Sequence, residues 1–222
     1  MLPFNQLAAE TTCGATVLHC LNYNAKCLSC PQFSKYELCD ILDGEGIVSK
    51  TILLTGRPRV GKTTIIKEVV KRLPGRVGGF YTEEIRERGH RQGFRIVTLD
   101  RQEGILAHVN VKSRYRVSKY GVDLVSLERV GVTAIRHAIV ASDCVVIDEI
   151  GKMELFSAAF KEAVLAAIES DKLVLGTIML RSHPWADAVK AHPQVTLIKI
   201  TEANRDMAVQ LVLDFLSEGT CT

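Results

Sequence analysis

Residues 56–63 read Gly56-Arg57-Pro58-Arg59-Val60-Gly61-Lys62-Thr63, which matches the pattern G-x-x-x-x-G-K-[ST]. An apolar run at 52–54 precedes this stretch, and a run with helical spacing at 64–73 follows it. Strand, loop and helix in that order predict a loop whose backbone N–H groups cradle phosphate. Lys62 then reaches the β- and γ-phosphates, the Thr63 hydroxyl holds Mg²⁺, and the helix N-terminus adds positive charge. The alternative is an ordinary strand-turn-helix junction.

Strands and helices alternate along the chain after this loop, which predicts an α/β fold with a mostly parallel sheet and helices on both faces. The expected strands are 51–55, 77–81, 93–100, 104–109, 144–147, 173–178 and 195–200. The expected helices are 64–73, 124–140, 156–168 and 203–216. Turns rich in glycine and charge separate the second, third and fourth strands, so these form a small β insertion rather than a βαβ unit. Strand order stays open.

Length and composition predict one main domain with an appendage. The chain has 222 residues, of which 47% are hydrophobic, and we place the boundary so that 1–48 is an extension and 49–222 the domain. A net charge of +3 is too small to predict nucleic acid or membrane as the main partner, and composition is silent on protein partners. No apolar run approaches the roughly 20 residues that span a bilayer. We expect a soluble, cytoplasmic protein.

Two carboxylates follow the apolar strand Val145-Val146-Ile147, namely Asp148 and Glu149. Ligands of open α/β sheets bind at the carboxyl ends of the strands, so Asp148 is placed to hold Mg²⁺ together with Thr63. Glu149 points differently because strand side chains alternate, and it is the candidate that accepts a proton from, or orients, an attacking water. The alternative is that both residues only open the loop before Gly151 and cap the next helix.

Phosphoryl transfer needs mainly positioning and charge neutralisation, for which the chain offers several arginines. Arg86, Arg88, Arg91 and Arg95 lie in the β insertion, and Arg114 and Arg116 lie just beyond it. Most such residues are solvated surface side chains. Arg116 is our candidate for an arginine finger.

Four further stretches carry a resemblance to a known family: Gly79-Phe-Tyr-Thr-Glu-Glu-Ile-Arg86, Tyr120-Gly-Val-Asp-Leu124, Asp148-Glu-Ile-Gly-Lys-Met-Glu-Leu-Phe-Ser157 and Gly176-Thr-Ile178. Together they resemble the cancer-related or thermophilic nucleoside-triphosphatase family of small P-loop proteins. The resemblance covers roughly residues 51–217. It implies a P-loop NTPase three-layer sandwich that hydrolyses ATP, GTP, CTP and UTP to diphosphates, with Mg²⁺ and little base selectivity.

The resemblance also implies a set of nucleotide-binding residues. These are Gly56, Arg57, Pro58, Arg59, Val60, Gly61, Lys62, Thr63, Thr64, Val145, Val146, Ile147, Asp148, Glu149, Ile150, Gly151, Lys152, Asn204 and Arg205. The last two belong to a Thr-x-x-Asn-Arg segment after the final strand. The Arg205 guanidinium, stacked on a base, contacts every nucleobase similarly, which explains weak base selectivity. The alternative, to which we give equal weight, is that Thr201 caps the last helix and that Asn204 and Arg205 lie in its exposed first turn.

The first 48 residues lie outside the resemblance and hold five of the seven cysteines. Cys20, Cys27, Cys30 and Cys39 suit tetrahedral Zn²⁺ or a [4Fe–4S] cluster equally, with Cys13 and His19 as spare ligands. Clustered thiols in a reducing compartment favour metal over disulfides. Two plainer alternatives are small core residues on one helical face, because Cys13, Cys20 and Cys27 are seven apart, or a loosely ordered extension. Cys144 lies in an apolar strand and is expected in the core.

Two other functions compete with triphosphate hydrolysis. A nucleotide or nucleoside kinase uses the same loop but needs an acceptor pocket, and the arginines of the insertion are consistent with one. The carboxylate after Asp148 favours water as the acceptor instead. The third candidate is a nucleotide-dependent switch whose metal-bearing N-terminal segment senses redox state or binds a partner.

Overall fold

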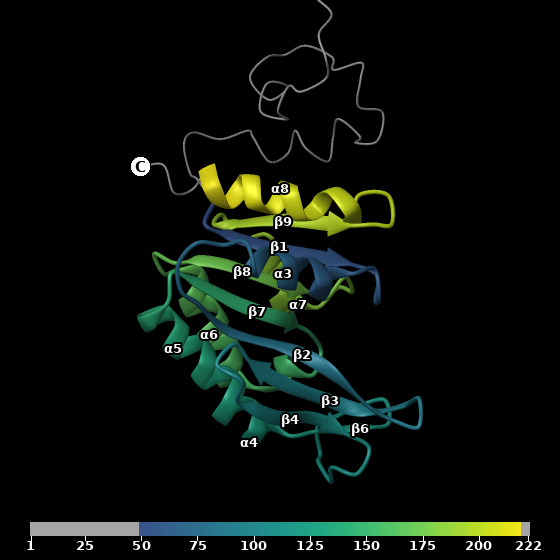
Figure 1. The fold of residues 1–222 in the computed structure, drawn as a ribbon. Coiled ribbons are helices and arrows are strands. Elements are labelled where there is room, and N and C mark those ends of the chain that lie inside the picture. The colour runs from purple at the N-terminus through teal and green to yellow at the C-terminus, as the bar shows by residue number, and fades with distance from the viewer. Residues whose placement is uncertain (1–48, 219–222) are drawn as a thin grey trace, which may run out of the picture. The chain divides into compact units, whose positions relative to one another are not determined.

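The computed structural model describes residues 49–218, which form a nine-stranded sheet with helices packed on it (Figure 1). The strands are β1 (Thr51–Gly56), β2 (Val77–Glu87), β3 (His90–Thr98), β4 (Glu103–His108), β5 (Arg116–Val117), β6 (Tyr120–Val122), β7 (Cys144–Ile150), β8 (Leu173–Ile178) and β9 (Val195–Ile200). The helical segments are α3 (Lys62–Val70), α4 (Leu124–Ser126), η1 (Leu127–Val132), α5 (Thr133–Ala141), η2 (Glu154–Phe156), α6 (Ala158–Ile168), α7 (Pro184–Lys190) and α8 (Arg205–Glu218).

The strand order, which the sequence left open, is β5-β6-β4-β3-β2-β7-β8-β1-β9. Strands β2, β7, β8, β1 and β9 are mutually parallel, so their carboxyl ends share one edge of the sheet. Strand β8 lies between β1, which leads into the phosphate loop, and β7, which carries the two carboxylates. The two halves of the predicted site therefore stand one strand apart.

Alternating side chains of the central strands build a separate apolar core on each face of the sheet. On one face Leu53 and Ile147 join a cluster with residues of α5 and α6, such as Ile135 and Phe160. On the other face Ile52 and Leu54 pack with residues of α3 and α8. Burial on both faces explains why the parallel strands read as continuous apolar runs. The predicted layers, with helices on both faces, are confirmed.

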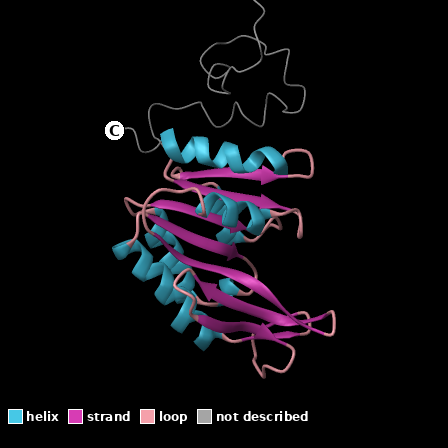
Figure 2. Ribbon diagram, in the orientation of Figure 1, coloured by secondary structure: helices cyan, strands magenta, loops and turns pink. Residues whose placement is uncertain are grey.

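The predicted β insertion is an extension of the same sheet rather than a separate module (Figure 2). Strand β2 continues to Glu87, well beyond the expected 77–81, and pairs in parallel with β7 and antiparallel with β3. Strands β4, β6 and β5 follow by antiparallel pairing. The insertion therefore reaches from the middle of the sheet to its edge, and its β2 strand runs directly beside the β7 carboxylates.

Helix prediction was correct in place but not in detail. The stretch 124–140 forms α4 and α5 with a π-helical turn, η1, between them, and 156–168 becomes a short 3₁₀ turn followed by α6. Ser157 caps α6, since its hydroxyl accepts a 3.1 Å hydrogen bond from the Phe160 N–H. Helix α7 was not expected, because it is only seven residues long and starts at Pro184. None of the helices within 49–218 is long and apolar enough to cross a membrane.

Candidate functional site

The phosphate loop connects β1 to α3, and two glycines give it its shape. Gly56 has φ 153°, and a Cβ there would lie 2.5 Å from the Ile200 carbonyl oxygen. Gly61, at φ 109°, is the residue before α3, and no side chain caps that helix. The N–H groups of the first turn therefore stay available to an anion, with the helix dipole behind them. The loop has the form that binds phosphate, as the sequence predicted.

Lys62 lies over the loop rather than out in solvent. Its Nζ donates hydrogen bonds of 3.2 Å to the Gly56 carbonyl and 3.3 Å to the Arg57 carbonyl. These neutral partners hold the ammonium at the mouth of the loop without cancelling its charge. The side chain is thus already positioned for a phosphate oxygen, which reduces the ordering cost of binding.

Asp148 is 1% exposed at the carboxyl end of β7. Its Oδ1 accepts a hydrogen bond from the Thr177 hydroxyl on β8, whereas its buried Oδ2 has no partner in residues 49–218. Burial raises the pKa of this carboxyl, while Thr177, Thr63 and the Lys62 ammonium act in the opposite direction. A buried carboxylate oxygen without a partner is unfavourable unless a cation or donor completes it.

The chemistry of this pair of residues fits Mg²⁺. The Asp148 carboxylate and the Thr63 hydroxyl are both oxygen donors, and Mg²⁺ takes oxygen ligands. Mg²⁺ also binds through few protein groups and completes its shell with water and substrate phosphates. Residues 49–218 contain no group of three metal-ligating His, Cys, Asp or Glu side chains. Thr63 and Asp148 are therefore the residues able to hold the ion.

Glu149 and Glu154 converge on Gly151, in the loop after β7. A Cβ at Gly151 would lie 3.1 Å from Glu149 Oε1 and 2.9 Å from Glu154 Oε2, so a side chain there would crowd both. The Gly151 N–H donates a 3.1 Å hydrogen bond to Glu154 Oε2. Burial, and then the neighbouring Asp148 carboxylate, raise the pKa of Glu149, which makes its carboxylate a stronger base.

Glu154 is fully enclosed, and its role was not predicted from the sequence. Burial, followed by repulsion from Glu149, raises the pKa of Glu154 from 4.5 to about 8. At neutral pH this residue is thus mainly a neutral acid beside the partly exposed Glu149. Because Glu154 keeps its proton, the carboxylates of Glu149 and Glu154 do not place two negative charges next to one another.

Replacing Glu154 by glutamine is expected to change how stability depends on pH. Because the folded-state pKa lies above 4.5, the folded protein binds the extra proton between pH 4.5 and 8, and the free energy of unfolding falls as pH rises through that window. Glutamine keeps the acceptor for Gly151 but cannot ionise. The free energy of unfolding is measured by urea unfolding in EDTA. The value for Glu154→Gln minus the value for wild type should increase by about 2 to 5 kcal/mol between pH 5 and pH 9. An equal difference at both pH values would contradict the assignment.

Comparison with known proteins identifies the family. A family described as NTPase matches residues 51–213, most of the chain. A nucleoside-triphosphatase THEP1 of Thermotoga sp. (strain RQ2) is 47% identical over 165 residues, which cover 74% of this chain and 94% of the relative. The chain belongs to this NTPase family. A second THEP1, from Methanocaldococcus jannaschii, is 41% identical over 172 residues and covers 76% of this chain and 98% of its own length.

Two solved structures of the NTPase family share the fold. The crystal structure of THEP1 from Aquifex aeolicus has a TM-score of 0.69 and 35% identity, covering 75% of this chain and 98% of its own. The solution structure of a human cancer-related nucleoside triphosphatase has a TM-score of 0.65 and 35% identity, covering 76% and 97%. The resemblance seen in the sequence and the predicted fold class are both confirmed.

Most of the residues that the NTPase resemblance implied lie at one edge of the sheet. Gly56 of β1 pairs with Ile200 of β9, so the turn that leads to Asn204 and Arg205 begins beside the phosphate loop. Asn204 is occupied by that turn: its Oδ1 accepts from the Thr201 N–H at 2.8 Å and its Nδ2 donates to the Lys199 carbonyl at 2.9 Å. Arg205 is exposed, with Asp206 3.5 Å away. Of these two residues, Arg205 has the more exposed side chain.

Other members of the set support the NTPase site without reaching it. The side chains of Val145, Val146, Ile147 and Ile150 are buried in the core, where they hold β7 and thereby Asp148 in place. Thr64, on the first turn of α3, and Lys152, in the loop after β7, are exposed. Arg116 lies on β5, the outermost strand of the insertion, and its guanidinium donates to the Lys119 carbonyl at 2.9 Å. Its role as an arginine finger stays a prediction.

The structure adds residues that the sequence reasoning left without a role. Thr177 and Glu154 both lie in stretches that carried the family resemblance, but only the fold brings them to Asp148 and Gly151. On the β2 side, the Lys67 ammonium lies 3.9 Å from the Tyr81 ring centroid and 3.0 Å from Glu83 Oε1. For Glu154, the sequence offered one local signal of burial: this glutamate stands between Met153 and Leu155, ahead of an apolar helix.

The predicted cysteine metal site at Cys20, Cys27, Cys30 and Cys39 lies outside the described residues, and the family match begins only at residue 51. Neither Zn²⁺ nor an iron–sulfur cluster gains support. Cys144 is 2% exposed, and burial raises the pKa of its thiol to about 12. It is an inert core residue, as predicted.

Proposed function

We propose that this chain hydrolyses nucleoside triphosphates to diphosphate and phosphate, with Mg²⁺ and with little selectivity for the base. The observation that carries the proposal is the Oδ2 of buried Asp148, which has no hydrogen-bond partner within residues 49–218 and lies at the carboxyl edge of the sheet with Thr63 and Lys62 of the phosphate loop. The relatives named nucleoside-triphosphatase support the reaction class.

Each residue has a separate task in this reaction. The loop N–H groups and Lys62 bind the β- and γ-phosphates and neutralise the charge that the leaving diphosphate gains. Thr63 and Asp148 would hold Mg²⁺, which would supply positive charge against the negative charge of the phosphates. Glu149 orients the attacking water and accepts its proton while the bond between the γ-phosphorus and the bridging oxygen breaks.

Weak base selectivity follows from the two side chains that the turn after β9 places beside the phosphate loop, Asn204 and Arg205. Arg205, exposed at the start of α8, presents a planar guanidinium that stacks on any nucleobase with similar strength. Asn204, the neighbouring amide, is already engaged with the backbone of its own turn. A stacking contact without hydrogen-bond readout does not discriminate ATP from GTP, CTP or UTP.

Phosphoryl transfer to a nucleoside or nucleotide acceptor uses the same loop and is the second candidate. The position of Glu149, directly after the residue that holds Mg²⁺, favours water as the acceptor. The switch hypothesis depends on the cysteine-rich segment, which lies outside residues 49–218. Hydrolysis is therefore the function that the site supports best.

The metal requirement tests the role of Asp148. Asp148→Asn keeps the acceptor for Thr177 but loses the anionic ligand, so half-maximal turnover should require at least about tenfold more Mg²⁺. The measurement is phosphate release from ATP across a Mg²⁺ titration. The matched control is Asp171→Asn, at an exposed aspartate next to β8, which should leave the titration unchanged. An unchanged requirement in Asp148→Asn would remove Asp148 from the metal site.

A further inference from the structure

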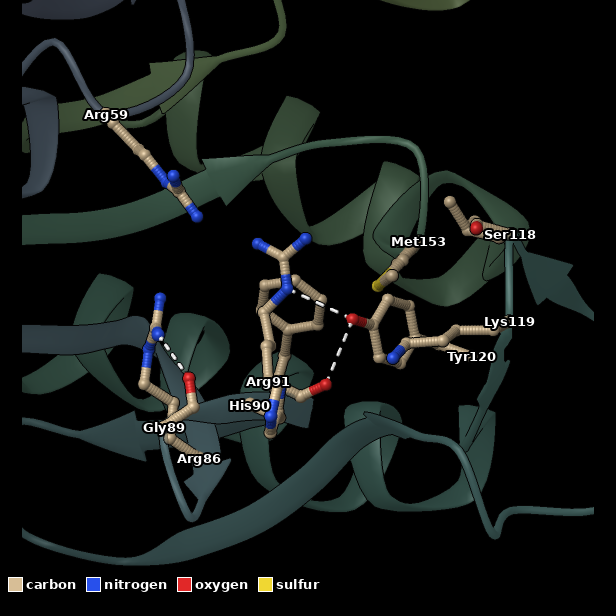
Figure 3. Close-up of a pocket in the computed structure, with 11 residues that line it drawn as sticks. Arg59, Arg86, Gly89, His90, Arg91, Ser118, Lys119, Tyr120 and Met153 are labelled. Atoms are coloured by element: carbon tan, nitrogen blue, oxygen red, sulfur yellow. Dashed lines mark hydrogen bonds between the residues drawn. The ribbon is translucent and has the colours of Figure 1, made fainter.

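A cavity of about 560 Å³ opens between the phosphate loop and the β insertion (Figure 3). Arg59 comes from the phosphate loop and Met153 from the loop after β7. The other lining residues come from β2, from its turn into β3, and from strands β3, β5 and β6 with the connection between the last two. The residues that matter here are Arg59, Arg86, Arg91, Phe94, Lys119 and Tyr120. The side chains of these six residues have no task in the hydrolytic mechanism above, although Arg59 belongs to the phosphate loop whose N–H groups bind phosphate.

The cavity carries more positive charge than its surroundings neutralise. Glu84 is the carboxylate that pairs with its cations: Oε1 lies 2.7 Å from Arg91 Nη1, and Oε2 lies 2.5 Å from Arg86 Nη2. Arg59 and Lys119 have no carboxylate partner in residues 49–218. Figure 3 shows the guanidinium groups of Arg59 and Arg91 pointing toward one another. Two cations that face each other repel unless an anion lies between them, so the geometry favours an anionic ligand.

The same cavity has a rigid, planar wall. Phe94 and Tyr120 pack edge to face with ring centroids 5.4 Å apart. The Arg91 guanidinium lies 5.0 Å from the Phe94 ring, and its Nε donates a 3.1 Å hydrogen bond to the Tyr120 hydroxyl. Arg91 is thus held in place by an aromatic ring, a hydroxyl and Glu84 before any ligand arrives. A fixed guanidinium beside an aromatic ring is a surface on which a planar heterocycle stacks.

We propose that this cavity binds a nucleoside monophosphate, as a second ligand beside the triphosphate on the phosphate loop. Its phosphate lies among Arg59, Arg86 and Lys119, and its base stacks against Arg91 and Phe94. The volume is within the range of small-molecule sites, about 300 to 1,000 Å³. A polynucleotide would instead need a groove with several stacking positions along it, whereas the aromatic wall of this cavity is the single pair Phe94 and Tyr120.

Binding of AMP to the full chain tests this site directly. The phosphate loop is first saturated with Mg²⁺ and β,γ-imido-ATP, and AMP is then titrated by calorimetry. One equivalent of AMP should still bind. Arg91→Ala, which loses both the charge and the stacking surface, should weaken AMP binding at least about tenfold, and Lys119→Met should weaken it without disturbing Glu84. Arg136→Ala, at an exposed arginine on α5, is the charge-matched control and should bind AMP normally.

Lys62→Ala separates this inference from the proposed hydrolysis. That variant should lose triphosphate binding and still bind AMP, because Lys62 does not line the cavity. Three results would overturn the proposal: complete displacement of AMP by β,γ-imido-ATP, unchanged AMP affinity in both Arg91→Ala and Lys119→Met, or binding of a single-stranded oligonucleotide without binding of AMP.

Discussion

Lys62→Ala is expected to lower triphosphate turnover roughly a thousandfold or more, close to complete loss. The Lys62 ammonium lies over the phosphate loop, held by the Gly56 and Arg57 carbonyls, and no other cation is held in that position in residues 49–218. Alanine therefore removes the main positive charge from the β- and γ-phosphates, both in the bound state and in the transition state. The variant loses the two hydrogen bonds from the Lys62 ammonium to the Gly56 and Arg57 carbonyls. The loop keeps its shape, because the two glycines and α3 define it.

Phosphate release and nucleotide affinity should both be measured for this variant. Lys71→Ala is the control, since Lys71 lies at the other end of the same helix, is exposed and pairs with Glu68 at the surface. It should retain normal turnover, because surface ion pairs of this kind contribute about 0 to 1 kcal/mol. Near-normal turnover by Lys62→Ala would show that residues 56–63 are not the catalytic phosphate site.

Glu149→Gln is expected to lower turnover roughly a hundredfold or more while nucleotide binding persists. Glutamine has nearly the same shape as glutamate and still orients a water, but it cannot accept a proton. The lost interaction belongs to the transition state, so kcat falls while the affinity for the triphosphate stays or rises slightly. Removal of one negative charge near the phosphates favours the second outcome.

Single-turnover hydrolysis and equilibrium binding of β,γ-imido-ATP separate these two effects. The control is Glu162→Gln, at an exposed glutamate on α6 away from the site, which should behave as wild type. If Glu149→Gln turned over normally, the proton acceptor would have to be another group.

Contiguous motifs explain what the sequence predicted well. The phosphate loop is eight consecutive residues, and Asp148 and Glu149 follow directly on an apolar strand, so local pattern alone places each of them. Because parallel strands end at one edge, the pattern also brings the two motifs together without knowledge of strand order. The core position of Cys144 was predicted equally well, because a cysteine inside a buried apolar strand is itself buried.

Tertiary neighbours explain what the sequence did not predict. Thr177 matters because β8 lies between β1 and β7, and nothing within 173–178 encodes that order. Glu154 matters because the loop after β7 folds it under Gly151, where burial rather than its own sequence context sets its pKa. The cationic cavity combines Arg59 with residues 27 or more positions away, which only the long β2 strand brings near.

The most direct test of the account is phosphate release by the purified chain from ATP, GTP, CTP and UTP, with Mg²⁺ or with EDTA, and with Glu149→Gln measured in parallel. We expect release from all four triphosphates at similar rates, only with Mg²⁺, and strongly reduced release by the variant. Nucleotide binding without release from any of the four, or release that persists in EDTA and in Glu149→Gln, would contradict it.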